Sequence, residues 1–133
     1  MKIVMHENVS LADYCTMKLG GNARYLCTVS NKEELAEAVT WGSEQGLRIL
    51  MLGGGSNLVF SEGGFDGLVI VDQITGFNAV HEDDDSTTVV IGAGEEWDVV
   101  VEKTVDMNLS GIEALSLIPG STGGTPVENV GAY

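Results

Sequence analysis

Three consecutive glycines, Gly53 to Gly55, follow an apolar run at residues 49–52 and precede Ser56 and Asn57. The apolar run predicts a buried strand. Glycine loses more backbone entropy on folding than any other residue, and a tight turn needs only one or two of them. The remaining reason for so many is close approach, because backbone N–H groups without neighbouring Cβ atoms can touch a ligand. A concave array of such groups binds anions, phosphate above all. The competing interpretation is a plain glycine loop between two strands.

The charge balance limits the partners of such a site. The chain has 133 residues, enough for one ordinary domain, with 20 acidic and 6 basic residues and a net charge of −14. This acidity argues against nucleic acid and anionic membranes as partners and favours solubility. No lysine or arginine lies in a glycine-rich stretch. A phosphate bound there would therefore be held mainly by backbone N–H groups.

Other features indicate a cytoplasmic protein without a metal. No apolar run reaches membrane-spanning length, and residues 1–10 lack the apolar core of a signal peptide. Cys15 and Cys27 are twelve positions apart, without metal-ligand spacing, and we expect reduced thiols, although spacing alone leaves a disulfide open. The acidic run at residues 82–85 lacks the alternating ligands of a calcium loop and is expected to be a solvated hairpin tip.

The first half of the chain has the pattern of a parallel strand–helix–strand crossover. Residues 1–22 are expected to form an extended arm. Strands are predicted at 24–29 and 48–52. Between them, Ser30 with Glu33 has the pattern of a capping box, and Gly46 is placed to end the helix.

The second half alternates strands with one helix and closes in a long loop. Strands are predicted at 67–71, 76–81 and 86–91, and a helix over 95–107. Residues 112–118 predict a short helix or strand. Residues 119–133 are again rich in glycine and small hydroxyl residues and contain no closing element, so we expect a fragment of a longer protein.

Two common phosphate-binding motifs do not match. The Walker motif needs a lysine after its last glycine, and the segment 120–125 has none. The Rossmann fingerprint needs a third glycine, where the first loop has Leu58 and the segment beginning at Gly92 has Trp97. What remains is a glycine loop between strands and a second Gly/Ser/Thr loop later in the chain.

Taken together, the motifs of the chain resemble a known family. The segments 52–58, 92–94, 118–126 and 129–133, with 14–21 near the N-terminus, resemble in order and spacing the bacterial UDP-N-acetylenolpyruvoylglucosamine reductases (MurB). Cys15 departs from the asparagine usual in that family. The resemblance covers nearly the whole chain.

The resemblance implies an α+β fold built of two small α/β lobes, the FAD-binding domain of the vanillyl-alcohol-oxidase (PCMH) type, which is not a Rossmann fold. The first lobe is expected at 1–66 and the second at 67–133, truncated at its C-terminal end. It implies an oxidoreductase of peptidoglycan synthesis and cell-wall biogenesis that acts in cell-shape maintenance. NADPH reduces non-covalently bound FAD, and the flavin reduces the enolpyruvyl group of a UDP-N-acetylglucosamine derivative to give UDP-N-acetylmuramate.

The resemblance also implies which residues bind the cofactor. They occupy three stretches: Gly53, Gly54, Gly55, Ser56, Asn57 and Leu58 in the first loop; Pro119, Gly120, Ser121, Gly123, Gly124 and Thr125 in the second; and Asn129, Gly131 and Ala132 beside it. No catalytic residue is assigned, because the protonating serine, its glutamate and the catalytic arginine of the family match nothing in this chain. The 133-residue chain alone is therefore expected to be inactive.

Other functions are compatible with the same residues. The chain could be an isolated flavin- or nucleotide-binding module without reductase activity, or the FAD lobe of another oxidase of the superfamily. The second alternative is weakened because no attachment histidine stands beside the glycine loop. A homodimer through the face left by a missing lobe is a further expectation.

Overall fold

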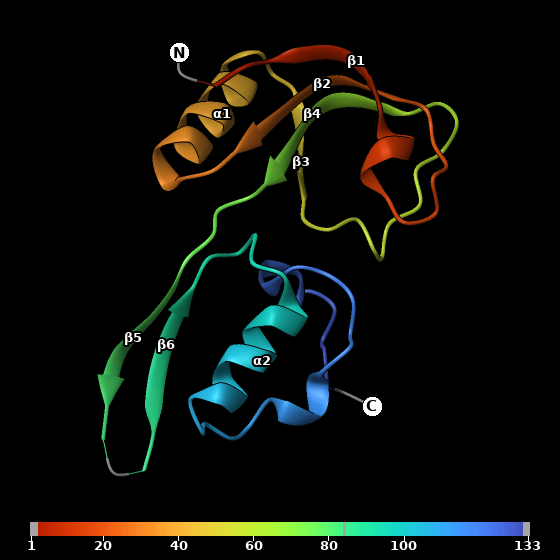
Figure 1. Ribbon diagram of the computed structural model, residues 1–133. Helices are drawn as coiled ribbons and strands as arrows, with labels where there is room; N and C mark the ends of the chain where they lie inside the picture. Colours follow the sequence, from red (N-terminus) through yellow and green to blue (C-terminus); the bar gives the residue numbers. More distant parts are fainter. Residues whose placement is uncertain (1–2, 84, 132–133) are drawn as a thin grey trace.

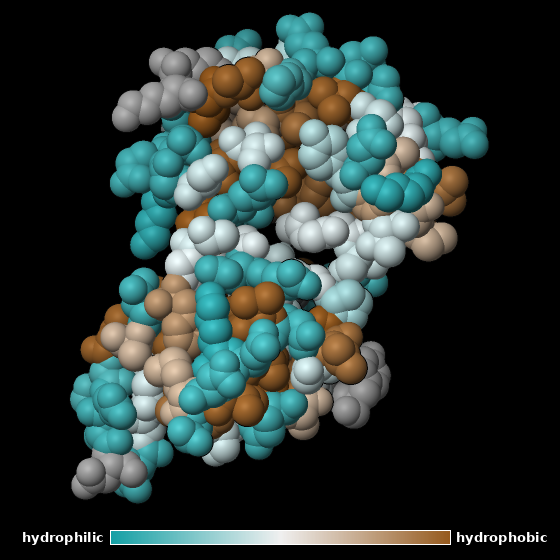
Figure 2. Space-filling view, viewed as in Figure 1, coloured by the Kyte–Doolittle hydropathy of each residue, from teal (hydrophilic) through white to brown (hydrophobic). Residues whose placement is uncertain are grey.

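The computed structural model describes residues 3–83 and 85–131 and shows two lobes joined by a short connection (Figure 1). The first lobe contains a four-stranded sheet with one α-helix, and the second contains a two-stranded hairpin with the other. The space-filling view shows pale, small residues gathered where the two lobes meet (Figure 2). Within the described ranges, neither helix is long and apolar enough to cross a membrane.

The sheet of the first lobe has the order β1-β2-β4-β3. Its strands are β1 (His6–Ser10), β2 (Asn22–Val29), β3 (Arg48–Leu52) and β4 (Phe65–Asp72). β2 and β3 both run parallel to β4, which lies between them, and β1 is antiparallel to β2. The predicted crossover is confirmed, with a later strand inserted at its centre. The N-terminal arm is more structured than expected, because it supplies β1 and the short 3-10 helix η1 (Leu11–Tyr14).

The pairing of β4 corrects the expected boundary between the lobes. A division at residue 66 would cut through β4, whose backbone is paired on both sides within the first sheet. A strongly apolar, β-branched strand buried on both faces belongs at the centre of a parallel sheet. The change of lobe therefore falls after β4, in the connection 73–76.

Alternating residues of β4 supply both halves of the first core. Leu68 and Ile70 pack towards the helix α1 (Lys32–Glu44), while Val69 and Val71 pack towards η1 and the loop that contains Leu58. This period of two is the geometry of a strand.

The ends of α1 follow local chemistry, with one correction. Asn31, and not Ser30, is the N-cap: its side chain accepts a hydrogen bond from the Glu34 N–H at 2.9 Å. The Glu34 carboxylate in turn accepts from the Ser30 N–H at 2.7 Å, so the reciprocal capping pattern is shifted by one residue. Gly46, at φ +65°, follows the helix end as predicted.

The second lobe is built on the hairpin of β5 (Phe77–Glu82) and β6 (Thr87–Ile91) and on α2 (Trp97–Asp106). Trp97, Val100 and Val101 form its core with Phe77 and Ile91 from the hairpin. The 3-10 helices η2 (Glu113–Leu115) and η3 (Thr122–Gly124) follow. Val105, towards the end of α2, is half exposed.

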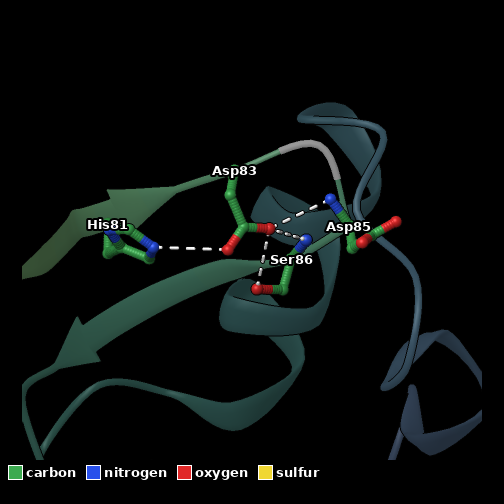
Figure 3. A network of polar contacts seen from close by, with 4 residues as sticks. All are labelled: His81, Asp83, Asp85 and Ser86. Atoms are coloured by element: carbon green, nitrogen blue, oxygen red, sulfur yellow. Dashed lines mark hydrogen bonds and ion pairs between the residues drawn. The ribbon is translucent and has the colours of Figure 1, made fainter.

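Asp83 organises the acidic hairpin tip (Figure 3). One carboxylate oxygen accepts from the Asp85 N–H at 3.0 Å, from the Ser86 N–H at 2.7 Å and from the Ser86 hydroxyl at 3.2 Å. These donors, the Asp85 N–H foremost, lower the pKa of Asp83. The side chain is thus used to close the turn, as expected for a solvated tip.

Candidate functional site

The first glycine loop, residues 53–57, packs against the N-terminal arm through Gly55. Gly55 is buried at φ +67°, and a Cβ atom on it would lie 2.0 Å from the carbonyl oxygen of Tyr14. The Gly55 carbonyl accepts a hydrogen bond from the Thr16 N–H at 3.1 Å. Both the backbone conformation and the close approach require glycine at this position.

The backbone N–H groups of this loop are its candidate anion donors. Outside the strand ladders and within the described ranges, no backbone carbonyl accepts a hydrogen bond from the N–H groups of residues 53–57. Gly53, Gly54 and Asn57 are exposed to solvent. Backbone N–H groups of a glycine-rich loop that lack a backbone acceptor are the arrangement expected of an anion site, and of residues 53–57 only Gly55 is fully buried.

The second glycine loop, residues 119–125, lies along the segment that enters α2. The Trp97 N–H donates to the Gly120 carbonyl at 3.0 Å, and the Thr122 N–H donates to the Glu95 carbonyl at 2.8 Å. Gly123 approaches so closely that a Cβ atom on it would lie 2.7 Å from the Cβ of Ala93. The loop is thereby fixed to the second lobe.

The two loops meet across the junction of the lobes. A Cβ atom on Gly53 would lie 2.2 Å from the Ser121 hydroxyl oxygen, and one on Gly54 would lie 3.5 Å from the Gly120 Cα. The Ser56 hydroxyl lies 3.3 Å from the Pro119 carbonyl oxygen and donates to it. Residues predicted from separate parts of the sequence thus form one continuous surface of backbone and small side chains.

A further contact joins the loops at one edge. The Asn57 side-chain amide donates to the carboxylate of Glu128, which follows the second loop. Glu128 was not predicted as a site residue. Its position is fixed by its N–H, which donates to the Gly124 carbonyl at 3.0 Å.

Not every predicted residue reaches this surface. Leu58 packs into the first core, and Thr125 uses its hydroxyl on the Thr122 carbonyl at 2.8 Å. Asn129 (φ +52°) and Gly131 (φ +88°) adopt left-handed backbone conformations. Ala132 lies outside the described residues.

Asp98 was missed by the sequence analysis although it holds the approach to the second loop. Its carboxylate accepts from the Ser116 hydroxyl and from the Leu117 N–H, both at 2.7 Å. These donors, the Leu117 N–H foremost, lower the pKa of Asp98. No local signal in the sequence indicates a contact across eighteen or nineteen positions.

Neither glycine loop contains a lysine or an arginine. A surface hollow of about 610 Å³ lies elsewhere on the first lobe, lined among others by Asn22, Arg24 and Asp66. It contains no residue of either loop. This hollow is therefore separate from the candidate site at the junction of the lobes.

The comparisons with known proteins agree with this geometry. A family profile described as an FAD-binding domain matches residues 23–133. UDP-N-acetylenolpyruvoylglucosamine reductase of Thermobifida fusca (strain YX) is 48% identical over 127 residues, which are 96% of this chain and 36% of that protein. The enzyme of the same name from Salinispora arenicola (strain CNS-205) is 45% identical over 92% of this chain and 34% of its own length. The chain thus spans about a third of the curated relatives it matches.

A solved structure shares the fold. The crystal structure of UDP-N-acetylenolpyruvylglucosamine reductase (MurB) from Thermus caldophilus superposes with a TM-score of 0.63 at 31% identity, covering 94% of this chain and 41% of that one. The two-lobed arrangement without a Rossmann sheet is therefore similar to that of a solved reductase. The chain belongs to the family of FAD-binding domains, and within that family it is similar to the MurB reductases.

Proposed function

We propose that the two glycine loops bind FAD without a covalent bond, with the pyrophosphate on the backbone N–H groups of residues 53–57. Ser121 is placed to add a hydroxyl donor, and the small residues of the second loop allow the flavin-bearing part of the cofactor to approach. One observation carries the proposal: the glycine loop 53–57 of one lobe lies in contact with the glycine loop 119–125 of the other.

The chemistry of the donors fits a pyrophosphate. Two phosphate groups need several hydrogen-bond donors, and with no cation in either loop the backbone must supply them. A Cβ atom at Gly53 would displace the Ser121 hydroxyl from its place between the two loops. FAD, when bound, would accept a hydride from NADPH and pass it to a substrate double bond. The described residues contribute binding and orientation.

Titration of the purified chain with flavins tests this proposal. We expect FAD to bind, with quenching of flavin fluorescence and a shift of its visible absorbance. We expect riboflavin, which lacks phosphates, to bind far more weakly, and ADP to compete with FAD. A colourless protein that takes up no added FAD, or one that binds riboflavin as well as FAD, would contradict a pyrophosphate cradle.

We further propose that the whole protein reduces UDP-N-acetylglucosamine enolpyruvate to UDP-N-acetylmuramate in the cytoplasm, with NADPH as reductant. The similarity to reductases of that name across almost the entire chain supports this step. The chain spans only about a third of those relatives, and none of its residues matches the family's proton donor. We therefore expect residues 1–133 alone to oxidise no NADPH in the presence of that substrate. Turnover by the isolated chain would overturn this expectation.

An isolated flavin-binding module is the alternative. Its distinguishing feature lies in the coding frame after Tyr133. A downstream tyrosine–arginine pair, a serine and a C-terminal glutamate would support the reductase, whereas a stop or an unrelated domain would favour the module.

A further inference from the structure

The segment Gly92-Ala93-Gly94-Glu95, which we call the brace, matches a motif of the family but belongs to neither glycine loop. On one side it packs against the connection between the lobes. The Gly92 N–H donates to the Gly76 carbonyl at 2.8 Å, and the Gly94 N–H donates to the Ile74 carbonyl at 2.9 Å. A Cβ atom on Gly92 would lie 2.2 Å from that Ile74 carbonyl oxygen. The glycines of the brace therefore allow contact with the connection and not with a ligand.

On its other side the brace holds the second glycine loop. The Ala93 carbonyl accepts from the Gly123 N–H at 2.8 Å. The Glu95 carbonyl accepts from the Thr122 N–H at 2.8 Å and from the Thr122 hydroxyl at 3.1 Å. The brace thus lies between the connection and the loop and is bonded to both.

The side chain of Glu95 completes this arrangement. One carboxylate oxygen accepts from the Gly76 N–H at 2.9 Å, and the other lies 4.0 Å from the Lys103 ammonium nitrogen. Lys103 itself lies over the ring of Phe77, 5.6 Å from its centre. With only 15% of its side chain exposed, Glu95 is well shielded from solvent. A single residue therefore binds the connection with its side chain and the second loop with its main chain.

We propose that Glu95 is a positioning residue for the cofactor. By fixing Gly76 and Thr122 relative to each other, it sets where the second glycine loop stands against the first. The proposal rests on the proposed function of these loops in FAD binding. Glu95 touches neither loop surface with its carboxylate, so its effect on the cofactor is indirect.

The Gly76 N–H depends on the Glu95 carboxylate as its hydrogen-bond acceptor. Gly76 has a φ of +137°, a backbone conformation that lets this N–H point at the Glu95 carboxylate. A hydrogen bond to an ionised acceptor is stronger than one between neutral groups, and a partly buried donor without a partner is costly. Without the carboxylate, the Gly76 N–H would lose its acceptor, and the connection would be held to the brace only by the Gly92–Gly76 and Gly94–Ile74 hydrogen bonds. We expect the orientation of the lobes to be less tightly fixed as a result.

Three variants of the 133-residue chain separate the possibilities. Glu95→Ala removes the acceptor, Glu95→Asp keeps the charge but is one methylene too short, and Glu95→Gln keeps an acceptor of the same length. Glu102→Ala, an exposed position of α2, is the matched control for loss of a negative charge. Each is measured for amide hydrogen exchange at Gly76, for interlobe orientation by residual dipolar couplings, and for FAD affinity.

We expect Glu95→Ala and Glu95→Asp to speed exchange at Gly76, to alter the interlobe couplings and to weaken FAD binding about tenfold. Glu102→Ala should behave like the natural chain in all three measurements, and Glu95→Gln, which keeps only a neutral acceptor, should lie between the natural chain and Glu95→Ala. Unchanged exchange and couplings in a folded Glu95→Asp chain would overturn the positioning role. Changed exchange and couplings with an unchanged FAD affinity would overturn its link to the cofactor. If the natural chain itself bound no FAD, the proposed function would fail, and the exchange and couplings would still decide whether Glu95 fixes the connection.

Discussion

The hydroxyl of Ser56 donates a hydrogen bond to the carbonyl oxygen of Pro119 at 3.3 Å, across 63 positions of sequence and between two lobes. Each residue lies in a glycine-rich loop whose conformation is set by its own lobe. The site therefore exists only where the two lobes are correctly joined. Substitutions in the loops, in the residues that support them and in the cores should therefore have different effects on FAD affinity and on the free energy of unfolding.

Substitution of Gly55 tests the support of the first loop. Gly55→Ala would place a Cβ atom 2.0 Å from the Tyr14 carbonyl oxygen in a left-handed backbone. We expect a loss of unfolding free energy of about 3 kcal/mol and a large loss of FAD affinity. The control is Gly46→Ala, which has a similar φ of +65° and nothing within 4 Å of the new atom. Gly46→Ala should lower the free energy of unfolding in urea by only about 1 kcal/mol and leave FAD binding unchanged. Equal effects of the two substitutions would contradict the steric argument.

A double-mutant cycle tests the edge contact between the loops. Asn57→Ala and Glu128→Ala each remove one partner of the amide–carboxylate hydrogen bond. In thermal unfolding without cofactor we expect a coupling free energy of about 0.5–1 kcal/mol between them. Asn57→Ala combined with Glu102→Ala should be additive. Additivity of the first pair as well would mean that the contact contributes nothing to joining the lobes.

Asp98 provides a pH-dependent support of the second loop. Its folded-state pKa lies below the ordinary value of 3.8, so its contribution is complete above that value and declines as the pH falls through the folded-state pKa. We expect Asp98→Ala to speed exchange of the Leu117 amide at neutral pH and to weaken FAD binding.

Asp98→Asn is the matched variant, since its side-chain oxygen still accepts a hydrogen bond but does not titrate. Leu117 exchange should depend on pH between 4 and 2 more steeply in the natural chain than in Asp98→Asn, relative to the intrinsic exchange rates. The same slope in both chains would show that Asp98 does not hold this segment.

Cys27 makes a separate prediction for alkaline stability. Burial on β2 raises the pKa of its thiol to about 11, whereas the unfolded thiol titrates near 9.0. Its contribution is complete below pH 9.0 and is lost as the pH rises towards 11, by at most about 1.4 kcal/mol per pH unit. The free energy of unfolding measured in urea should therefore fall more between pH 8.5 and 10.5 for the natural chain than for Cys27→Ala. Parallel pH profiles would exclude the thiol as the cause.

The sequence predicts most of the elements because their signals are local. The apolar run of β3, the left-handed Gly46 and the β-branched strand β4 each depend on neighbouring residues only. Both glycine loops are also predicted from the sequence as parts of a binding site, the first from its backbone chemistry and the second from the family resemblance. That the two loops lie in contact is a property of the structure alone.

The parts that could not be predicted depend on pairing between distant residues. β4 looks like the start of a second lobe in the sequence, because the long loop 53–64 separates it from β3. Only its pairing with both β2 and β3 places it in the first sheet. Asp98 and Glu95 likewise act on residues 18 or more positions away, and carboxylates near a helix start are ordinarily explained by the helix dipole.

The central position of β4 also has a consequence for synthesis on the ribosome. β2 and β3 leave the ribosome before the strand that joins them, so each waits with an unpaired apolar edge until Asp72 has emerged. Such edges are sites of intermolecular pairing. The interval is lengthened by the loop that contains the glycines. A delay in translation within this loop would therefore expose the nascent chain to aggregation, and chaperone binding should peak there.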